Sequence, residues 1–232
     1  MTEHLQFKDS NPGAVKYGNF INYYQFHPPE ERIGLLPKDI WVQNSNDFLA
    51  LDIGCNSGDL TFALWKFLKS AVMQDVFFLA VDIDPVLIER AKEANKDNRI
   101  CFHCLDIVDE TNRNHVINNY LQLKNAVQFD AVFCFSTTMW IHLNHGDIGL
   151  KVFLSYISKL GKLLVIEPQP WKCYKSALKR VKDKTIFPYF QTLKIRGNIE
   201  SEIEKYLVEE IGLVKVFDSE RTNWDRKIMI FK

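Results

Sequence analysis

The sequence has no surplus of charge of either sign. Lysine and arginine together number 29, and aspartate and glutamate also number 29, so the formal net charge at pH 7 is zero. A protein without net charge has no global field that would attract nucleic acid, and an anionic ligand has to be bound by a local positive cluster. Net charge therefore excludes no class of substrate, and the substrate has to be inferred from motifs.

The sequence also lacks long apolar runs and an even set of cysteines. No stretch reaches the roughly 18 apolar residues of a membrane-spanning helix, and the opening MTEHLQFKDS is unlike a secretory signal. The five cysteines are an odd number, and most fall inside expected strands, which favours reduced thiols. We therefore expect a cytoplasmic protein, with a nuclear location as the alternative, that has no membrane partner.

Strands and helices are predicted to alternate through most of the chain. Its 232 residues, of which 47% are hydrophobic, suffice for a full core, so we expect a single domain over 1–232. Strands are expected at 48–54, 77–83, 100–106, 129–136 and 162–167. Helices are expected at 59–70, 86–95, 113–123, 148–160 and 172–182. Such alternation is typical of an α/β fold with a parallel sheet and right-handed crossovers.

The two ends of the chain depart from this alternation. A helix expected at 199–211 precedes two apolar runs, at 213–217 and 227–231, which can pair as an antiparallel hairpin and complete a seven-stranded, Rossmann-like sheet. Residues 17–37 are rich in aromatics and prolines, and they are too irregular for a strand and too apolar for a disordered tail. We expect residues 1–40 to form an arm that covers the ligand site.

A glycine turn follows the first predicted strand. Gly54 and Gly58 bracket Asn56 and lead into a helix, so a ligand can lie against the main chain and near free helical amides. Asp82 ends the next strand, where a carboxylate can bind ribose hydroxyls, and Asp106 ends the third. The glycines do not satisfy G-x-G-x-x-G, which favours S-adenosylmethionine over a dinucleotide. Alternatively, the glycines only end a strand and Asp82 only caps the following helix.

A polar loop is expected after the fourth strand, at the sheet edge where ligands bind in open α/β folds. It carries His142, Asn144, His145 and Asp147. Zinc needs three or four ligands and no third ligand is evident, so we expect no metal and instead assign hydrogen-bonding roles to the two histidines and Asn144. The alternatives are that Asp147 caps the next helix and that Asn144 holds a turn.

The fifth strand ends in a proline-stiffened segment, EPQPW, followed by lysines. Trp171 can stack on a nucleobase or close the core. A helix would align Lys172, Lys175, Lys179 and Lys182 along one face. Such a stripe is either solvated surface or, because it starts at the expected ligand site, a contact for a phosphate backbone.

Five ordered motifs are together similar to one known family. The segments YGNF…YYQFHPPEERIGLLP, LDIGCNSGDLT, VDIDPVLIERA, TTMWIHLNHGD and EPQPWKCY resemble the bicoid-interacting-protein-3 family of RNA-methylating enzymes, over about residues 17–231. Ser57-Gly58-Asp59 and His145 resemble the branch that methylates RNA 5′-monophosphates. They are less similar to the methylphosphate capping branch, which modifies a 5′-triphosphate end.

This resemblance implies a class I methyltransferase with S-adenosylmethionine as donor and a 5′-phosphate of RNA as acceptor. Transfer RNA for histidine and precursor microRNAs are the substrates associated with the branch. Tyr23 and His27 correspond to RNA-facing positions, although His27 replaces an arginine; we also count Trp171, Lys172 and Lys175 as substrate residues. The implied cofactor contacts, together with Gly54 of the turn, are Arg32, Asn56, Asp82, Asp106, Ile107 and Phe135.

The chemistry of the acceptor agrees with this resemblance. A phosphate monoester is already anionic at neutral pH, since its second pKa is near 6, so methyl transfer needs no general base. Excess positive charge would weaken the nucleophile, and we therefore expect neutral or titratable donors, namely Tyr23, His142, Asn144 and His145, rather than an arginine clamp.

We expect a monomer. The competing hypotheses are a small-molecule or protein methyltransferase and a non-catalytic RNA-binding module.

Overall fold

The computed structural model describes residues 16–41, 47–181 and 183–232, and it contains one seven-stranded sheet. The strand order is β3-β2-β1-β4-β5-β7-β6, in which the first five strands are parallel and β7 runs antiparallel to both β5 and β6. This confirms the predicted parallel sheet with a terminal antiparallel hairpin. The strands are β1 (Phe48–Ile53), β2 (Val76–Asp82), β3 (Ile100–Cys104), β4 (Phe129–Phe135), β5 (Gly161–Glu167), β6 (Lys215–Asp218) and β7 (Met229–Phe231).

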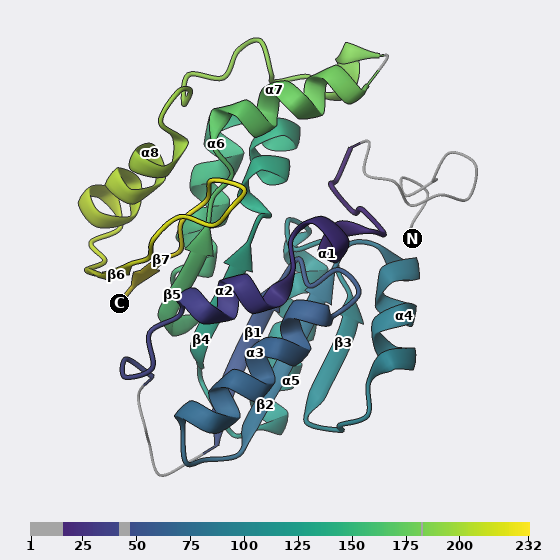
Figure 1. The fold of residues 1–232 in the computed structure, drawn as a ribbon, viewed down its shortest axis with the longest axis vertical. Helices are drawn as coiled ribbons and strands as arrows, with labels where there is room; N and C mark the ends of the chain where they lie inside the picture. Colours follow the sequence, from purple (N-terminus) through teal and green to yellow (C-terminus); the bar gives the residue numbers. More distant parts are fainter. Residues whose placement is uncertain (1–15, 42–46, 182) are drawn as a thin grey trace.

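Helices cover both faces of the sheet (Figure 1). One hydrophobic cluster joins the sheet to α2, α3 and α4, and a second joins its other face to α5, α6, α7 and α8. The helices are α1 (Tyr23–Phe26), α2 (Pro29–Leu35), α3 (Asp59–Ala71), α4 (Pro85–Ala94), α5 (Glu110–Leu123), α6 (Thr138–Ile157), α7 (Trp171–Arg180) and α8 (Ile199–Lys205), with short turns η2 (Lys184–Ile186) and η3 (Tyr206–Glu210).

The sequence of β1 explains why this strand lies at the centre. All six of its residues are buried. Leu49, Leu51 and Ile53 pack into one cluster, whereas Phe48 and Ala50 pack into the other. Successive side chains of a strand point to opposite faces, so a continuous apolar run is what a sheet covered on both sides requires.

Three predicted helices differ from the structure by three or more residues at one end or both, and the others by one or two. The expected polar loop before residue 148 is helical: α6 starts at Thr138 and contains a kink at Gly146, whose φ of 70° and ψ of −174° interrupt the helix. Polar residues in this segment interrupt the apolar periodicity from which a helix is predicted. Helix α5 starts earlier than predicted, since Asp109 accepts hydrogen bonds from the amides of Thr111 and Asn112. The helix predicted at 199–211 ends at Lys205 and continues as the π-helical η3.

The described part of the predicted arm, from residue 16 onward, packs across the sheet; residues 1–15 lie outside the description. In Figure 1 the purple α1 and α2 cross in front of the strands. The Asn56 side chain donates to the carbonyl of Phe20 at 3.0 Å, and the Asn19 side chain donates to Asp84 Oδ2 at 2.7 Å. The arm is therefore bound directly to the loops that follow β1 and β2.

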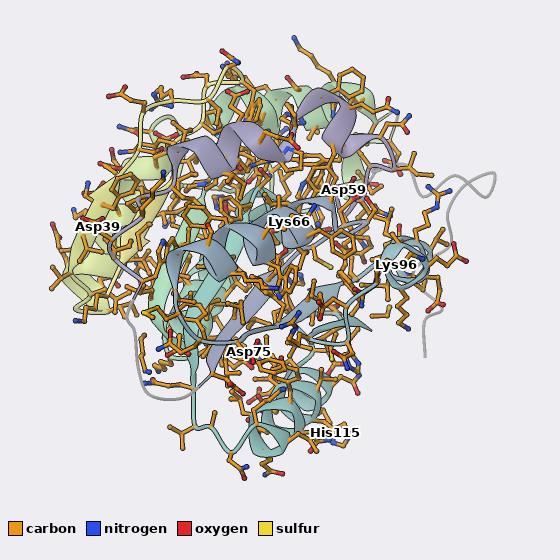
Figure 2. All side chains as sticks on the ribbon, turned by 60° about the horizontal axis from the view of Figure 1, so that its bottom comes forward. Asp39, Asp59, Lys66, Asp75, Lys96 and His115 are labelled. Atoms are coloured by element: carbon orange, nitrogen blue, oxygen red, sulfur yellow. The ribbon has the colours of Figure 1, made fainter. Side chains whose placement is uncertain are left out.

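Charged side chains are distributed over the outside of the molecule. Figure 2 labels six exposed ionisable residues on several helices and loops, namely Asp39, Asp59, Lys66, Asp75, Lys96 and His115. Both acidic and basic side chains are among them, as expected for a chain with zero net charge. Within residues 16–41, 47–181 and 183–232, no helix is long and apolar enough to cross a membrane.

Candidate active site

A cavity of about 790 Å³ lies between the carboxyl ends of the strands and the arm. Its wall includes residues from the loops after β1, β2, β3 and β4, from the arm, and from the loop before β7. Ligands of open α/β sheets bind at this edge, where β1 and β4 diverge, and the volume is within the range of small-molecule sites.

The glycine turn forms one wall of the cavity where side chains have no room. Gly54 has a φ of +80°, and a Cβ there would lie 2.2 Å from Thr137 Oγ1. Gly58 has a φ of +84°, and its Cβ would lie 2.8 Å from the Phe102 ring. Both positions therefore need glycine on conformational and steric grounds. Asn56 also adopts a positive φ, of 52°, and its backbone amide faces Asp82.

Asp82 organises the turn instead of capping a helix. Its carboxylate accepts the amide of Asn56 at 2.8 Å and the amide of Asp84 at 2.9 Å. Asp84 is the residue that caps α4, so the capping alternative for Asp82 is wrong. Burial raises the pKa of Asp82 to about 6. Its carboxylate lines the cavity and keeps acceptor capacity for hydroxyl groups.

The remaining predicted cofactor residues also line the cavity. Asp106 is exposed, and its side chain accepts the amide of Val108 at 2.9 Å. Ile107 and Phe135 are buried and supply apolar wall on either side of the glycine turn. The structure thus brings together the ends of β1, β2, β3 and β4, as predicted, although the three-dimensional site includes more of the arm than the motifs indicated.

Arg32 forms a buried ion pair at the base of the cavity. Its guanidinium contacts both carboxylate oxygens of Glu167, with Nη2 2.8 Å from Oε2, and both side chains are 0% exposed. Nη2 also donates to the Tyr23 hydroxyl at 2.7 Å. Burial by itself would raise the pKa of Glu167, but the charges of Arg32 and Arg226 outweigh burial and lower it.

His27 lies beside this ion pair and is neutral. Its ring stacks on the Tyr23 ring, with centroids 4.5 Å apart. Burial and the charge of Arg226 lower its pKa from 6.5 to about 4. Tyr23 and His27 both line the cavity, and their contact with RNA stays a prediction.

The structure separates the predicted phosphate-positioning residues. Asn144 and His145 line the cavity. His142 does not lie among its described lining residues: its ring is buried and bonds to Asp147 Oδ1 at 2.8 Å and to the Tyr174 hydroxyl at 3.0 Å. Because His142 is buried and held by these two groups, its predicted role in positioning the phosphate is wrong. Asp147 neither caps the next helix nor reaches the cavity.

The predicted substrate residues of α7 are divided in the same way. Lys172 lines the cavity and pairs with Asp225 at 2.7 Å. Trp171 packs on Phe190 with ring centroids 5.5 Å apart and joins the core, so the packing alternative is correct for it. Lys175 is exposed on α7 outside the described cavity wall. Lys182 lies outside the described residues.

Sequence patterns missed several residues of the wall. Asp52, near the end of β1, lines the cavity but matches no ligand-binding pattern by itself. Burial raises its pKa to about 7. Ser136, Trp224 and Arg226 also line the cavity. The positive φ of Ser136 has no sequence signature, and the other two residues approach the site only because β7 pairs with β5.

Comparisons with known proteins agree with this arrangement. A family model described as bicoid-interacting protein 3 matches residues 129–232, and one described as methyltransferase domain matches residues 51–164. A computed superposition on the plantazolicin methyltransferase BpumL covers 97% of this chain and 91% of that chain, with a TM-score of 0.60 and 12% identity. The latter likeness concerns the fold alone.

Curated relatives cover nearly the whole chain. The RNA 5′-monophosphate methyltransferase of Rattus norvegicus is 41% identical over 95% of this chain and 84% of its own length. The pre-miRNA 5′-monophosphate methyltransferase of Xenopus laevis is 41% identical over 96% of this chain and 94% of its own. With this identity and coverage, the chain belongs to the bicoid-interacting-protein-3 family, in the branch of the RNA 5′-monophosphate methyltransferases.

Proposed function

We propose that this protein transfers a methyl group from S-adenosylmethionine to the 5′-monophosphate of a small RNA. One observation carries the proposal: one cavity has a wall suited to a nucleoside, where the first four strands end, and also contains the guanidinium of Arg226, which is suited to an anion. The names of the relatives support the same reaction, and two of them specify pre-miRNA. We include transfer RNA for histidine as a second candidate substrate, on the family resemblance.

The residues present fit the cofactor. Gly54 and Asn56 of the glycine turn line the cavity, so a ligand can lie against the main chain there. Asp82 would bind the ribose hydroxyls, and Ile107 and Phe135 would supply apolar contacts. When bound, S-adenosylmethionine supplies an electrophilic methyl group on a sulfonium.

The chain then has to position the acceptor and exclude water. A phosphate oxygen forms the new O–CH₃ bond while the S–CH₃ bond breaks and its electron pair goes to sulfur. No proton moves, because the monoester is already ionised. The catalytic contribution of the chain is therefore orientation, which holds the reacting atoms roughly 3–3.5 Å apart. Neither neutral His27 nor the inward-facing His142 has to act as a base.

One assay tests this function. The same small RNA is prepared with a 5′-hydroxyl, a 5′-monophosphate or a 5′-triphosphate, and transfer of labelled methyl from S-adenosylmethionine is measured. We expect transfer to the monophosphate and none to the hydroxyl. Asp82→Ala should abolish transfer through loss of cofactor binding, measured by calorimetry. Preferential labelling of the triphosphate would indicate a capping enzyme, and equal labelling of all three would place the acceptor elsewhere.

A further inference from the structure

Three ionised groups at the base of the cavity carry one uncompensated positive charge. Arg32 and Arg226 share a single carboxylate, that of Glu167. Both arginines line the cavity, whereas Glu167 is fully buried and is not among the described lining residues. His27 adds no charge because its pKa is lowered to about 4. The surface presented to a ligand is therefore cationic.

The uncompensated charge belongs mainly to Arg226. Arg32 uses Nε and Nη2 on Glu167 and Nη1 on the carbonyl of His27, so its guanidinium is already engaged on every nitrogen. Arg226 Nη1 is 3.9 Å from Glu167 Oε2, beyond hydrogen-bond distance, and it bonds to the neutral hydroxyls of Tyr23 and Ser136. Such hydroxyls orient a guanidinium without neutralising it.

Arg226 also keeps a donor without a partner. Its residue is 7% exposed, and its buried Nε makes no hydrogen bond within the described structure. Nη2 has only a 3.8 Å contact with the thiol of Cys173. Nη2 therefore keeps donor capacity for an anion bound in the cavity that Arg226 lines, and the unsatisfied Nε shows that the protein's own groups leave this guanidinium incompletely hydrogen-bonded.

The position of Arg226 distinguishes the acceptor from the cofactor. The ribose-binding candidate Asp82 ends β2, and the glycine turn follows β1. Arg226 comes from the loop before β7, which pairs with β5 on the opposite side of β4. A nucleoside bound over β1 and β2 therefore leaves the Arg226 side of the cavity for the second substrate.

We propose that Arg226 recognises the terminal 5′-phosphate of the RNA. Its planar fork contacts at most two of the three terminal oxygens and leaves the third to attack the methyl group. This inference rests on the proposed function. It also revises the expectation that all phosphate donors are neutral. The guanidinium of Arg226 orients the phosphate, whereas that of Arg32 is neutralised by Glu167.

Binding measurements test this role separately from turnover. Affinities for one RNA with a 5′-phosphate or a 5′-hydroxyl are measured by fluorescence anisotropy in the presence of S-adenosylhomocysteine. We expect the native protein to favour the phosphate by about 10-fold to 100-fold, the range of a charged hydrogen-bonded contact. Arg226→Met and Arg226→Gln should abolish this preference and leave affinity for the hydroxyl RNA and for S-adenosylhomocysteine unchanged.

Arg221→Met is the matched control. Arg221 lies in the same loop, pairs with Glu200 and Asp225, and is not among the described residues of the cavity wall. Its removal should preserve the preference. Undiminished preference in both Arg226 variants, or loss of S-adenosylhomocysteine affinity with the preference intact, overturns the assignment. Failure of the proposed function is distinct, since the native protein itself would then show no preference for the phosphate. Arg226→Gln keeps a hydrogen-bonding group, so a folded variant is available if Arg226→Met does not fold.

Discussion

At the scale of single residues, His27 illustrates how packing fixes a protonation state. Its ring lies between the Tyr23 ring and the edge of Trp224, whose centroid is 5.0 Å away. Burial and the charge of Arg226 both disfavour the imidazolium. His27, which stands where the capping relatives have an arginine, therefore carries no positive charge at neutral pH. The nearby positive charge comes from Arg226, in the loop before β7.

The pH dependence of stability should reveal this state. In the folded protein His27 titrates at about 4, against 6.5 for the unfolded chain. Between these pH values His27 is protonated in the unfolded chain and neutral in the folded protein. Its contribution to the free energy of unfolding therefore falls as the pH is lowered through this interval. Relative to the native protein, His27→Gln should lose less stability between pH 7 and pH 5 in urea unfolding.

Arg226→Gln provides the internal comparison for this prediction. Removing the neighbouring charge should raise the pKa of His27, as followed by NMR of its ring protons, while burial keeps it below 6.5. A His27 that titrates near 6.5 in the native protein would contradict the account.

Individual site residues were predictable where a local pattern existed. Asn56 stands between the glycines after one predicted strand and Asp82 at the end of the next, and that placement follows from the sequence alone. Arg226 has no such pattern, because its approach depends on the pairing of β7 with β5. His142 was misplaced because the sequence predicted a loop where the structure has a helix, and its position on that helix faces the interior.

At the scale of elements, α7 joins the cavity to an exposed basic face. Lys172 reaches the cavity wall, while Lys175 and Lys179 are exposed farther along the helix. Lys172 also pairs with Asp225, which ties the helix to the loop that carries Arg226. A strand of RNA whose 5′ end enters the cavity would leave along this face.

Charge reversal on α7 tests that path. Lys175→Glu combined with Lys179→Glu should weaken RNA binding by about tenfold or more at low salt and reduce the slope of log affinity against log salt by about one per lysine. Binding of S-adenosylhomocysteine should not change. Lys66→Glu combined with Lys96→Glu, exposed on other elements in Figure 2, is the control and should leave RNA affinity near native. Equal losses in both double variants would indicate a non-specific charge effect.

At the scale of the whole molecule, alternating periodicity was sufficient to predict the sheet. Buried strands such as β1 need apolar side chains on both faces, so their pattern survives in any sequence that folds this way. The internal geometry of the arm was less predictable: α1 and α2 are short and are held by contacts with distant loops rather than by their own periodicity.

Cofactor binding should order the arm. Residues 17–24 form a continuous part of the cavity wall, so a ligand bound in the cavity contacts them. Addition of S-adenosylhomocysteine should slow backbone hydrogen exchange in residues 17–27 by about tenfold or more. Exchange in α5, which packs on the sheet away from the described cavity wall, is the control and should stay constant. Unchanged exchange in the arm would mean that it does not cover the ligand.

The base of the cavity is assembled from stretches that are remote along the chain. Tyr23 and Arg226, which meet through a hydrogen bond, are separated by 203 positions, and Ser136 and Glu167 stand between them in sequence. Because synthesis on the ribosome proceeds from the N-terminus, the loop ahead of β7 is the last part of this site to be made. The ion pair of Arg32 and Glu167 therefore gains its second guanidinium only when translation is nearly complete.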